Sequence, residues 1–190
     1  MRLLLLTCAL SVLSAGCGTV PKSEADRAAL KLEIQGAIGK FKEKDPTLSS
    51  WFDEAKGYAI FPHIGKAGVG VGGSFGRGLV YKDGEQIGYI KVTEASIGLQ
   101  LGGQAFAQLI FFEKEASLER FISGKFEFGA QASAVAATAG AATKSNYENG
   151  VAVFTMVSGG LMYEATIGGQ KFKYTPNEEV EGGAGCGCGQ

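Results

Sequence analysis

Apolar residues recur at two different spacings along the chain, and the change from one to the other marks where helices give way to strands. Between residues 23 and 44 they return every three or four positions, which predicts one amphipathic helix that starts at Ser23. Asp45 can cap a second helix, which has Pro46 at its first position and ends at Gly57. A helical hairpin is therefore expected before the strands.

Beyond Gly57 the pattern is typical of strands. In the stretch 67–75, Val69, Val71 and Phe75 alternate with glycine or serine, so one strand face is bulky and the other bare, which suits strong bending. Asp83-Gly84 predicts a tight hairpin turn. Strands are expected over 58–61, 67–75, 79–81, 86–92, 95–112 (as two strands), 126–138, 150–158 and 161–174, and a helix over 114–123.

The short connections between these strands predict an antiparallel sheet. The chain of 190 residues holds 30 glycines, but most of them are interspersed with Val, Ile, Leu and Phe and so belong to folded structure. The expected fold class is α+β: an N-terminal helical hairpin packed on a strongly curved, partly barrel-like antiparallel β-sheet, with one helix inserted between two groups of strands.

Several segments form an ordered set of motifs. They are the glycine block 57–81, ASIGLQLGGQ at 95–104, LERFISG at 118–124 followed by Phe126, GAQAS at 129–133 and GGLMY at 159–163. Together they resemble the SYLF domain family, whose members are lipid-binding domains of yeast actin-patch proteins, animal and plant membrane proteins and bacterial lipoproteins. The last segment departs from the family's KGLFAG strand, because Gly159 replaces the lysine and Met162-Tyr163 replace small residues. The resemblance covers about residues 23–169.

The first residues have the parts of an export signal: Arg2, an apolar run over 3–13, and small residues over 14–16 that end at Cys17. This resembles a bacterial lipoprotein signal, in which the cysteine is diacylated and becomes the new N-terminus. The alternatives are an ordinary secretory signal and a short membrane anchor, although the run is too short to cross a hydrocarbon core of about 30 Å. Gly18 resembles the outer-membrane sorting pattern, so we expect a lipid-anchored protein of the bacterial outer membrane that faces the periplasm.

Four segments follow from these patterns: a signal peptide (1–16), a lipidated tether (17–22), a SYLF-like domain (23–175) and a disordered tail (176–190). The tail carries Cys186 and Cys188, for which a small disulfide and a soft-metal site are the functional alternatives. Removing the signal leaves 18 − 1 = 17 basic residues against 19 acidic ones, a net charge of about −2. That charge argues against nucleic-acid binding.

Three patterns that could indicate an enzyme have simpler interpretations. Glycines 68, 70 and 73 match the spacing G-x-G-x-x-G, but no helix start follows them, so a dinucleotide site is not expected. His63 is the only histidine and is interpreted as a structural residue at a strand end. Glu113, Glu115 and Glu119 lie at helical spacing and are interpreted as a solvated face. We therefore predict no catalytic residues, no cofactor and no metal.

Basic residues carry the remaining functional prediction. In eukaryotic members of the family that the chain resembles, lipid binding involves an N-terminal amphipathic segment and basic residues that engage phosphoinositide head groups. The matching residues here are Lys31, Lys40, Lys42 and Lys44 with the apolar Phe41, and Lys66 and Arg77 flank the glycine block. The alternative is that Ile34, Ile38 and Phe41 pack on the sheet while the lysines are solvated.

The predicted function is a non-enzymatic envelope lipoprotein whose domain binds lipid or a membrane surface, with an anionic phospholipid or another amphiphile as its ligand. The resemblance to yeast actin-binding relatives does not transfer well, because an exported protein would not meet cytoplasmic actin. The alternative function is a structural or protein-interaction lipoprotein with no lipid ligand beyond its own acyl anchor. An apolar cleft beside Lys66, Arg77 or the helix lysines would favour lipid binding, and a filled interior would favour the alternative.

Overall fold

The computed structural model of the chain describes residues 19–126, 133–157, 164–166 and 169–182. The described helices are α1 (Glu24–Lys44), α2 (Leu48–Glu54), α3 (Glu115–Ile122) and α4 (Asn177–Gly182), with a short 3₁₀ turn at Ala142–Lys144. The described strands are β1 (Gly57–Lys82), β2 (Glu85–Phe112), β3 (Ser133–Ala136), β4 (Val151–Val157), β5 (Glu164–Thr166) and β6 (Lys171–Pro176). The α+β class is confirmed.

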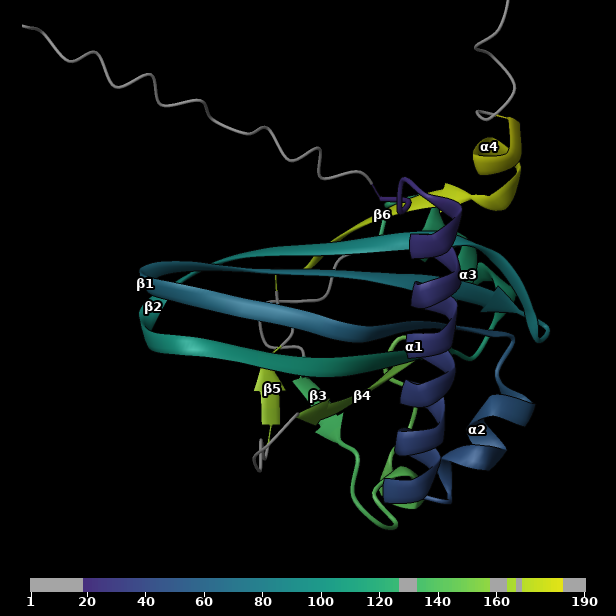
Figure 1. Cartoon of the computed structure of the whole chain (residues 1–190). Helices are drawn as coiled ribbons and strands as arrows, with labels where there is room; N and C mark the ends of the chain where they lie inside the picture. Colours follow the sequence, from purple (N-terminus) through teal and green to yellow (C-terminus); the bar gives the residue numbers. More distant parts are fainter. Residues whose placement is uncertain (1–18, 127–132, 158–163, 167–168, 183–190) are drawn as a thin grey trace, which may run out of the picture.

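One long hairpin of two strands dominates the sheet. β1 and β2 pair antiparallel along their length, and the strand order is β1-β2-β4-β3-β5, with β6 on the first half of β2. The expected separate strands within 58–81 and 86–112 are therefore continuous, although their pairing register shifts between Phe61 and Ile64, between Gly68 and Gly70 and between Val80 and Tyr81. β3 pairs with β4 in parallel, so the sheet is mixed and the prediction of an antiparallel sheet is wrong at this point. The sheet is strongly curved but is not closed into a barrel (Figure 1).

The curvature brings the two halves of β1 against each other. A Cβ at Gly78 would lie only 2.1 Å from the carbonyl oxygen of Ile60, so a residue with a side chain could not occupy this position. In Figure 1 both ribbons of the hairpin bend back at the left of the view and return toward α1. The predicted turn at the other end is confirmed, since Asp83 and Gly84 both have positive φ, at 49° and 82°.

Helices cover both faces of the sheet, and each face has its own apolar core (Figure 1). The core on the α1 side contains Leu30, Ile34, Phe41, Leu48, Ile60, Leu79, Leu109, Phe111 and Phe154. The core on the α3 side contains Phe61, Val80, Ile90, Val92, Phe106, Ile110, Phe112, Leu118, Phe121 and Val153. The inserted helix α3 is thus confirmed, and it ends before Gly124, whose φ is +70°.

The two N-terminal helices differ greatly in length. At 1.5 Å per residue, α1 is about 30 Å long and α2 about 10 Å, so α2 could match only about a third of the length of α1. The Ser23 side chain caps α1 by accepting a hydrogen bond from the Asp26 N–H, as the sequence predicts. α2 begins at Leu48 rather than at Pro46. The expected hairpin is therefore a long helix followed by a short one.

A buried carboxylate holds the junction between α1 and α2. Asp45 is fully buried and accepts hydrogen bonds from the N–H groups of Thr47, Gly140 and Ala142 and from the Thr47 hydroxyl. Burial alone would raise the pKa of this carboxyl, but the Thr47 hydroxyl and the three N–H groups outweigh it and lower the pKa below its ordinary value. Asp45 thereby ties the end of α1 to a loop 95 residues away.

The start of the expected tail is ordered. β6 extends to Pro176 and α4 follows it, so disorder from residue 176 onward is not what the structure shows. The side-chain amide of Asn177 donates a hydrogen bond to the backbone carbonyl oxygen of Gln86 at 2.6 Å and accepts one from the side-chain NH₂ of Gln86 at 3.0 Å. Cys186 and Cys188 lie outside the described residues, as do the signal segment, Cys17 and the motif at 159–163. Among the described helices, none combines the length and the apolar character needed to cross a membrane.

Candidate functional site

A surface groove of about 490 Å³ lies between the N-terminal half of α1 and strand β1. We call it the α1–β1 groove. One wall is formed by the segment before α1 and its first turns, with Pro21, Lys22, Asp26, Ala29, Leu30 and Glu33. The other wall is formed by two parts of β1, with Pro62, His63, Phe75, Gly76 and Arg77.

The fold-back of β1 builds the second wall. A Cβ at Gly76 would meet the carbonyl oxygen of His63 at 2.9 Å and a side-chain carbon of Ile64 at 2.7 Å, so the two parts of the strand touch here only because residue 76 is glycine. This contact places Pro62 and His63 beside Phe75 and Arg77. The groove therefore depends on the same curvature that glycine permits along the rest of β1.

The groove combines apolar surface with both signs of charge. Phe75 is 37% exposed, although large apolar residues are usually buried, and the Arg77 guanidinium lies over its ring at 5.4 Å from the centroid. Lys22 contributes a second cation, and Asp26 and Glu33 contribute carboxylates. Such a lining can contact the phosphate of an amphiphile at its cations while the apolar surface meets less polar parts of the molecule.

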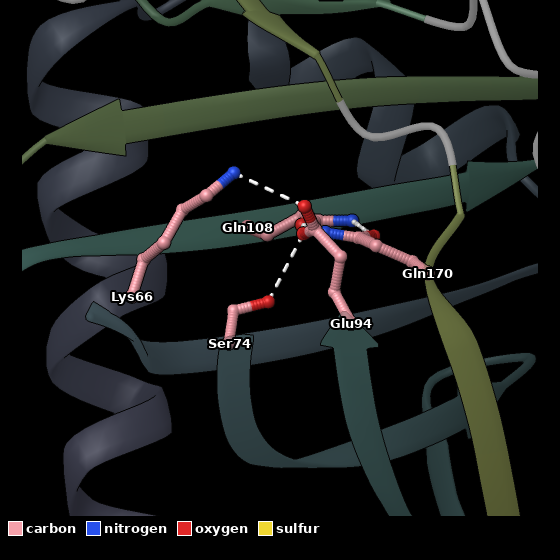
Figure 2. A network of polar contacts seen from close by, with 5 residues as sticks. All are labelled: Lys66, Ser74, Glu94, Gln108 and Gln170. Atoms are coloured by element: carbon pink, nitrogen blue, oxygen red, sulfur yellow. Dashed lines mark hydrogen bonds and ion pairs between the residues drawn. The ribbon is translucent and has the colours of Figure 1, made fainter. Parts of the chain in front are cut away.

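A second polar cluster lies inside the curve of the sheet. Figure 2 shows five side chains from distant parts of the chain gathered there. Glu94 accepts from Lys66 at 3.1 Å and from the Ser74 hydroxyl at 3.0 Å, while Gln108 and Gln170 exchange two amide hydrogen bonds at 3.0 and 3.1 Å. Their neighbours two positions along, Val92 and Phe106, belong to the α3-side core, so the cluster faces the same way.

Lys66 therefore does not present a bare charge to solvent. Its side chain is 18% exposed and that of Glu94 is 6% exposed, and the two charges neutralise each other. The structure does not bring Lys66 together with Arg77 at one site, because Arg77 lines the α1–β1 groove and Lys66 does not. The predicted pair of phosphate ligands on either side of the glycine block is thus divided.

The lysines of α1 that were predicted to bind lipid also lie at separate places on the surface. Lys31 lines a different groove, of about 520 Å³, with Arg27, Tyr89 and Asn177. Lys40 and Lys44 are exposed at the C-terminal end of α1, and the Lys42 ammonium lies 4.6 Å from the centre of the Phe52 ring. Lys31 and Lys44 are 13 residues apart, which is about 20 Å along a helix. These lysines cannot hold one head group together.

The structure corrects the prediction that Phe41 contacts lipid. Its side chain is fully buried in the α1-side core, as is that of Ile34, and Ile38 is packed against the same core. Phe41 therefore cannot insert into a membrane from the folded domain. The alternative interpretation, in which this face of α1 packs on the sheet, is the one that the structure has.

Two comparisons with known proteins find similar sequences. A family model described as Ysc84, Las17-binding protein actin regulator, matches residues 93–179. This match confirms the resemblance of the chain to the SYLF family over those residues. It is also 27% identical over 155 residues to beta cell expansion factor A of Aeromonas veronii, a match that covers 80% of this chain. The match covers 59% of that relative, so the chain spans less than two thirds of its length.

The groove and the interior cluster lie differently with respect to the segment that matches the family model. The segment that matches the family model contains Glu94, Gln108 and Gln170 from the interior cluster. The walls of the α1–β1 groove, from Pro21 to Glu33 and from Pro62 to Arg77, precede that segment. The groove is therefore built by a part of the chain that lies outside the family match. Arg77 is the predicted lipid-binding residue that lines this groove, whereas Lys22, Asp26, Glu33 and Phe75 were not predicted as site residues.

The patterns that could have indicated an enzyme are placed as follows. Glycines 68, 70 and 73 lie inside β1, which continues to Lys82, so the helix that a dinucleotide site requires does not follow them. His63 is exposed at the groove, and within the described residues no hydrogen bond or ion pair joins it to a carboxylate. Glu113, Glu115 and Glu119 are exposed, and Glu115 pairs with Lys82. No group of three potential metal ligands occurs among the described side chains.

Proposed function

We propose that this SYLF protein is a cell-envelope lipoprotein, anchored by an acylated Cys17, whose domain binds phospholipid head groups in the α1–β1 groove. The proposal includes no catalysis and no cofactor. SYLF proteins form a family of binding domains, which supports a binding role in general terms. The ligand proposed here is an anionic phospholipid, and its phosphate would lie between Lys22 and Arg77.

The observation that carries the proposal is the exposed Phe75 beneath Arg77 in a groove that also holds Lys22. An exposed aromatic ring beside two cations is the combination that interfacial binding sites use, because the ring contacts the glycerol region while the cations contact phosphate. Asp26 and Glu33 limit the net positive charge of the lining. We therefore expect binding that depends on contact in the groove more than on long-range attraction, consistent with a mature net charge of about −2.

The family description names an actin regulator, and that role is not proposed for this chain. An exported, acylated protein would be separated from cytoplasmic actin. The competing proposal is an interaction lipoprotein without a lipid ligand in its fold. It is an outcome of the experiment below, since such a protein would not bind vesicles once its acyl anchor is removed.

The test is vesicle co-sedimentation with a chain that begins at Gly18, which includes every described residue but cannot be acylated. Vesicles of phosphatidylcholine alone and with phosphatidylglycerol are compared at two salt concentrations. The double variant Lys22→Glu, Arg77→Glu is matched with Lys40→Glu, Lys44→Glu, which makes the same change of charge at exposed residues outside the groove. At about 1 kcal/mol for each basic residue at an anionic surface, we expect the groove variant to bind on the order of 30-fold more weakly.

The control variant should bind within about twofold of the wild type, because less than 0.5 kcal/mol is expected from residues that do not touch the ligand. Equal losses in both variants would show that only overall charge matters and would contradict a site in the groove. No binding of the wild-type chain to either vesicle would leave Cys17 as the membrane contact and would favour the interaction lipoprotein.

A further inference from the structure

The first described residues are held against the domain rather than extending from it. Thr19 and Pro21 are buried, and Val20 packs against the α1-side core. The guanidinium of Arg27, one turn into α1, lies 3.4 Å from the carbonyl oxygen of Pro21 and 3.5 Å from that of Lys22. These two contacts are long for hydrogen bonds, so apolar burial is the main source of the attachment. We call residues 19–22 the mount.

The mount leaves very little chain between the domain and Cys17. Gly18 is the single residue between Cys17 and Thr19, and two residue steps span at most about 7 Å. If residues 17–22 were instead a free tether, the six steps from Cys17 to the Ser23 cap of α1 would span up to about 21 Å. The buried mount thus removes about two thirds of the possible reach.

We propose that the mount fixes the orientation of the domain on the bilayer, with the α1–β1 groove facing the lipid surface. The proposal rests on the proposed acylation at Cys17. Pro21 and Lys22 of the mount are also lining residues of the groove, so whatever anchors Cys17 brings the groove to the membrane. The occupant of this face is the head-group layer of the same bilayer that holds the anchor.

The opposite end of α1 faces away in this arrangement. α1 extends about 30 Å from the mount to Lys44, so Lys44 lies at the end of α1 remote from the mount. A reporter at Lys44 and a reporter at Phe75 should therefore sense different distances from the lipid, although both positions are exposed. A free tether would let the domain reorient and would make the two reporters alike.

The experiment places the only tryptophan of the chain at one of these positions. In a Trp51→Phe, Cys186→Ser, Cys188→Ser chain that begins at Cys17, either Phe75→Trp or Lys44→Trp supplies the fluorophore. The Cys17 thiol is coupled to a maleimide lipid in phosphatidylcholine vesicles that carry brominated acyl chains, so the result does not depend on acylation in a cell. We expect bromine to quench the tryptophan at position 75 at least about threefold more than the one at position 44 if the groove faces the bilayer.

Two further variants separate the mount from groove binding. Val20→Ser, Pro21→Gly removes the apolar attachment of the mount, and we expect quenching at the two positions to become equal. Lys125→Ser, at an exposed residue outside the mount and the groove, should keep the difference. Circular dichroism and thermal unfolding must show the same fold in all variants. Equal quenching in the intact mount, or quenching at position 75 that persists after the mount is released, would overturn the proposal while leaving the sedimentation result unaffected.

Discussion

The two ends of α1 carry similar basic residues but differ in almost everything else. At the N-terminal end, Lys22 borders a groove with an exposed aromatic ring and belongs to the mount, in which Thr19 and Pro21 are buried. At the C-terminal end, Lys40 and Lys44 project from a helix whose inner face is filled by Phe41 and by the bonded carboxylate of Asp45. The difference teaches that a run of lysines does not by itself mark a binding site.

The position of the lysines at the C-terminal end of α1 has a local physical reason. Lys42 and Lys44 occupy the last turn of α1, and Glu24 and Asp26 occupy its first turn. Cations at the C-terminus and anions at the N-terminus of a helix interact favourably with the helix dipole, at about 0.3–1 kcal/mol each. Lys42 also covers the Phe52 ring. This distribution of charge stabilises the helix without requiring a ligand.

The largest expected effect concerns Phe41, which separates the two interpretations of this end of α1. Phe41→Ala should lower the free energy of unfolding by about 4 kcal/mol, because it removes a fully buried ring from a packed core. Urea unfolding followed by circular dichroism measures the loss. Leu32→Ala, at a residue that is 69% exposed on the same helix, should change stability by less than about 0.5 kcal/mol. Similar small effects for both variants would mean that Phe41 is available at the surface.

Asp45→Ala should lower the free energy of unfolding by about 3 kcal/mol, because it leaves the buried N–H group of Ala142 and the part-buried N–H group of Gly140 without their acceptor. Asp53→Ala, at an exposed carboxylate of α2, is the matched control and should have little effect. The lowered pKa gives the pH dependence its sign. The charged carboxylate stabilises the fold above the unfolded pKa of about 3.9, and this contribution is lost as the pH falls through the folded pKa. A difference between the variant and the wild type that grew below pH 4 would contradict this account.

Glu94→Gln should lower the free energy of unfolding by about 2 kcal/mol, because it leaves the ammonium of Lys66 beside a neutral amide in a largely buried cluster. Glu43→Gln changes the same charge at an exposed position and should have almost no effect. Both are measured by chemical unfolding at neutral pH. If vesicle binding by the Gly18 chain increased strongly in Glu94→Gln, Lys66 would belong to the lipid site after all.

The smallest expected effect is a gain of stability at the mount. The buried hydroxyl of Thr19 has no hydrogen-bond partner among the described residues, so its desolvation is not compensated. Thr19→Val keeps the shape of the side chain and should raise the free energy of unfolding by about 1 kcal/mol. Thr138→Val, at an exposed residue, provides the control. A loss of stability in Thr19→Val would place the hydroxyl in an environment other than the one described.

Local signals in the sequence account for much of this fold. Ser23 marks the start of α1, and the Asp83-Gly84 turn gives the register of the long hairpin. Counting outward from that turn would pair Ser74 with Thr93, but a register shift between Val80 and Tyr81 brings Ser74 opposite Glu94, so their contact could not have been predicted from the turn alone. The fold-back of β1 at Gly78 could not have been predicted either, because it depends on a contact between two halves of one strand.

The groove could not be predicted for the same reason. Its walls come from residues about 40 positions apart that share no periodic pattern, and Asp26 and Glu33 have an ordinary interpretation as helix residues. Sequence analysis selected lysines by charge and could not see that Lys66 has Glu94 as its partner across the curved sheet. The parallel pairing of β3 with β4 was missed because the rule of short antiparallel connections does not apply to the long segment between them.

Amide hydrogen exchange of the Gly18 chain, with and without phosphatidylglycerol vesicles, tests the central comparison most directly because it needs no substitution. We predict slower exchange on vesicle binding in peptides that contain the mount, the first turns of α1 and the Phe75–Arg77 part of β1, and unchanged exchange in peptides around Lys40 and Lys44. Slower exchange confined to the C-terminal end of α1 would contradict the assignment of the groove as the lipid-facing site.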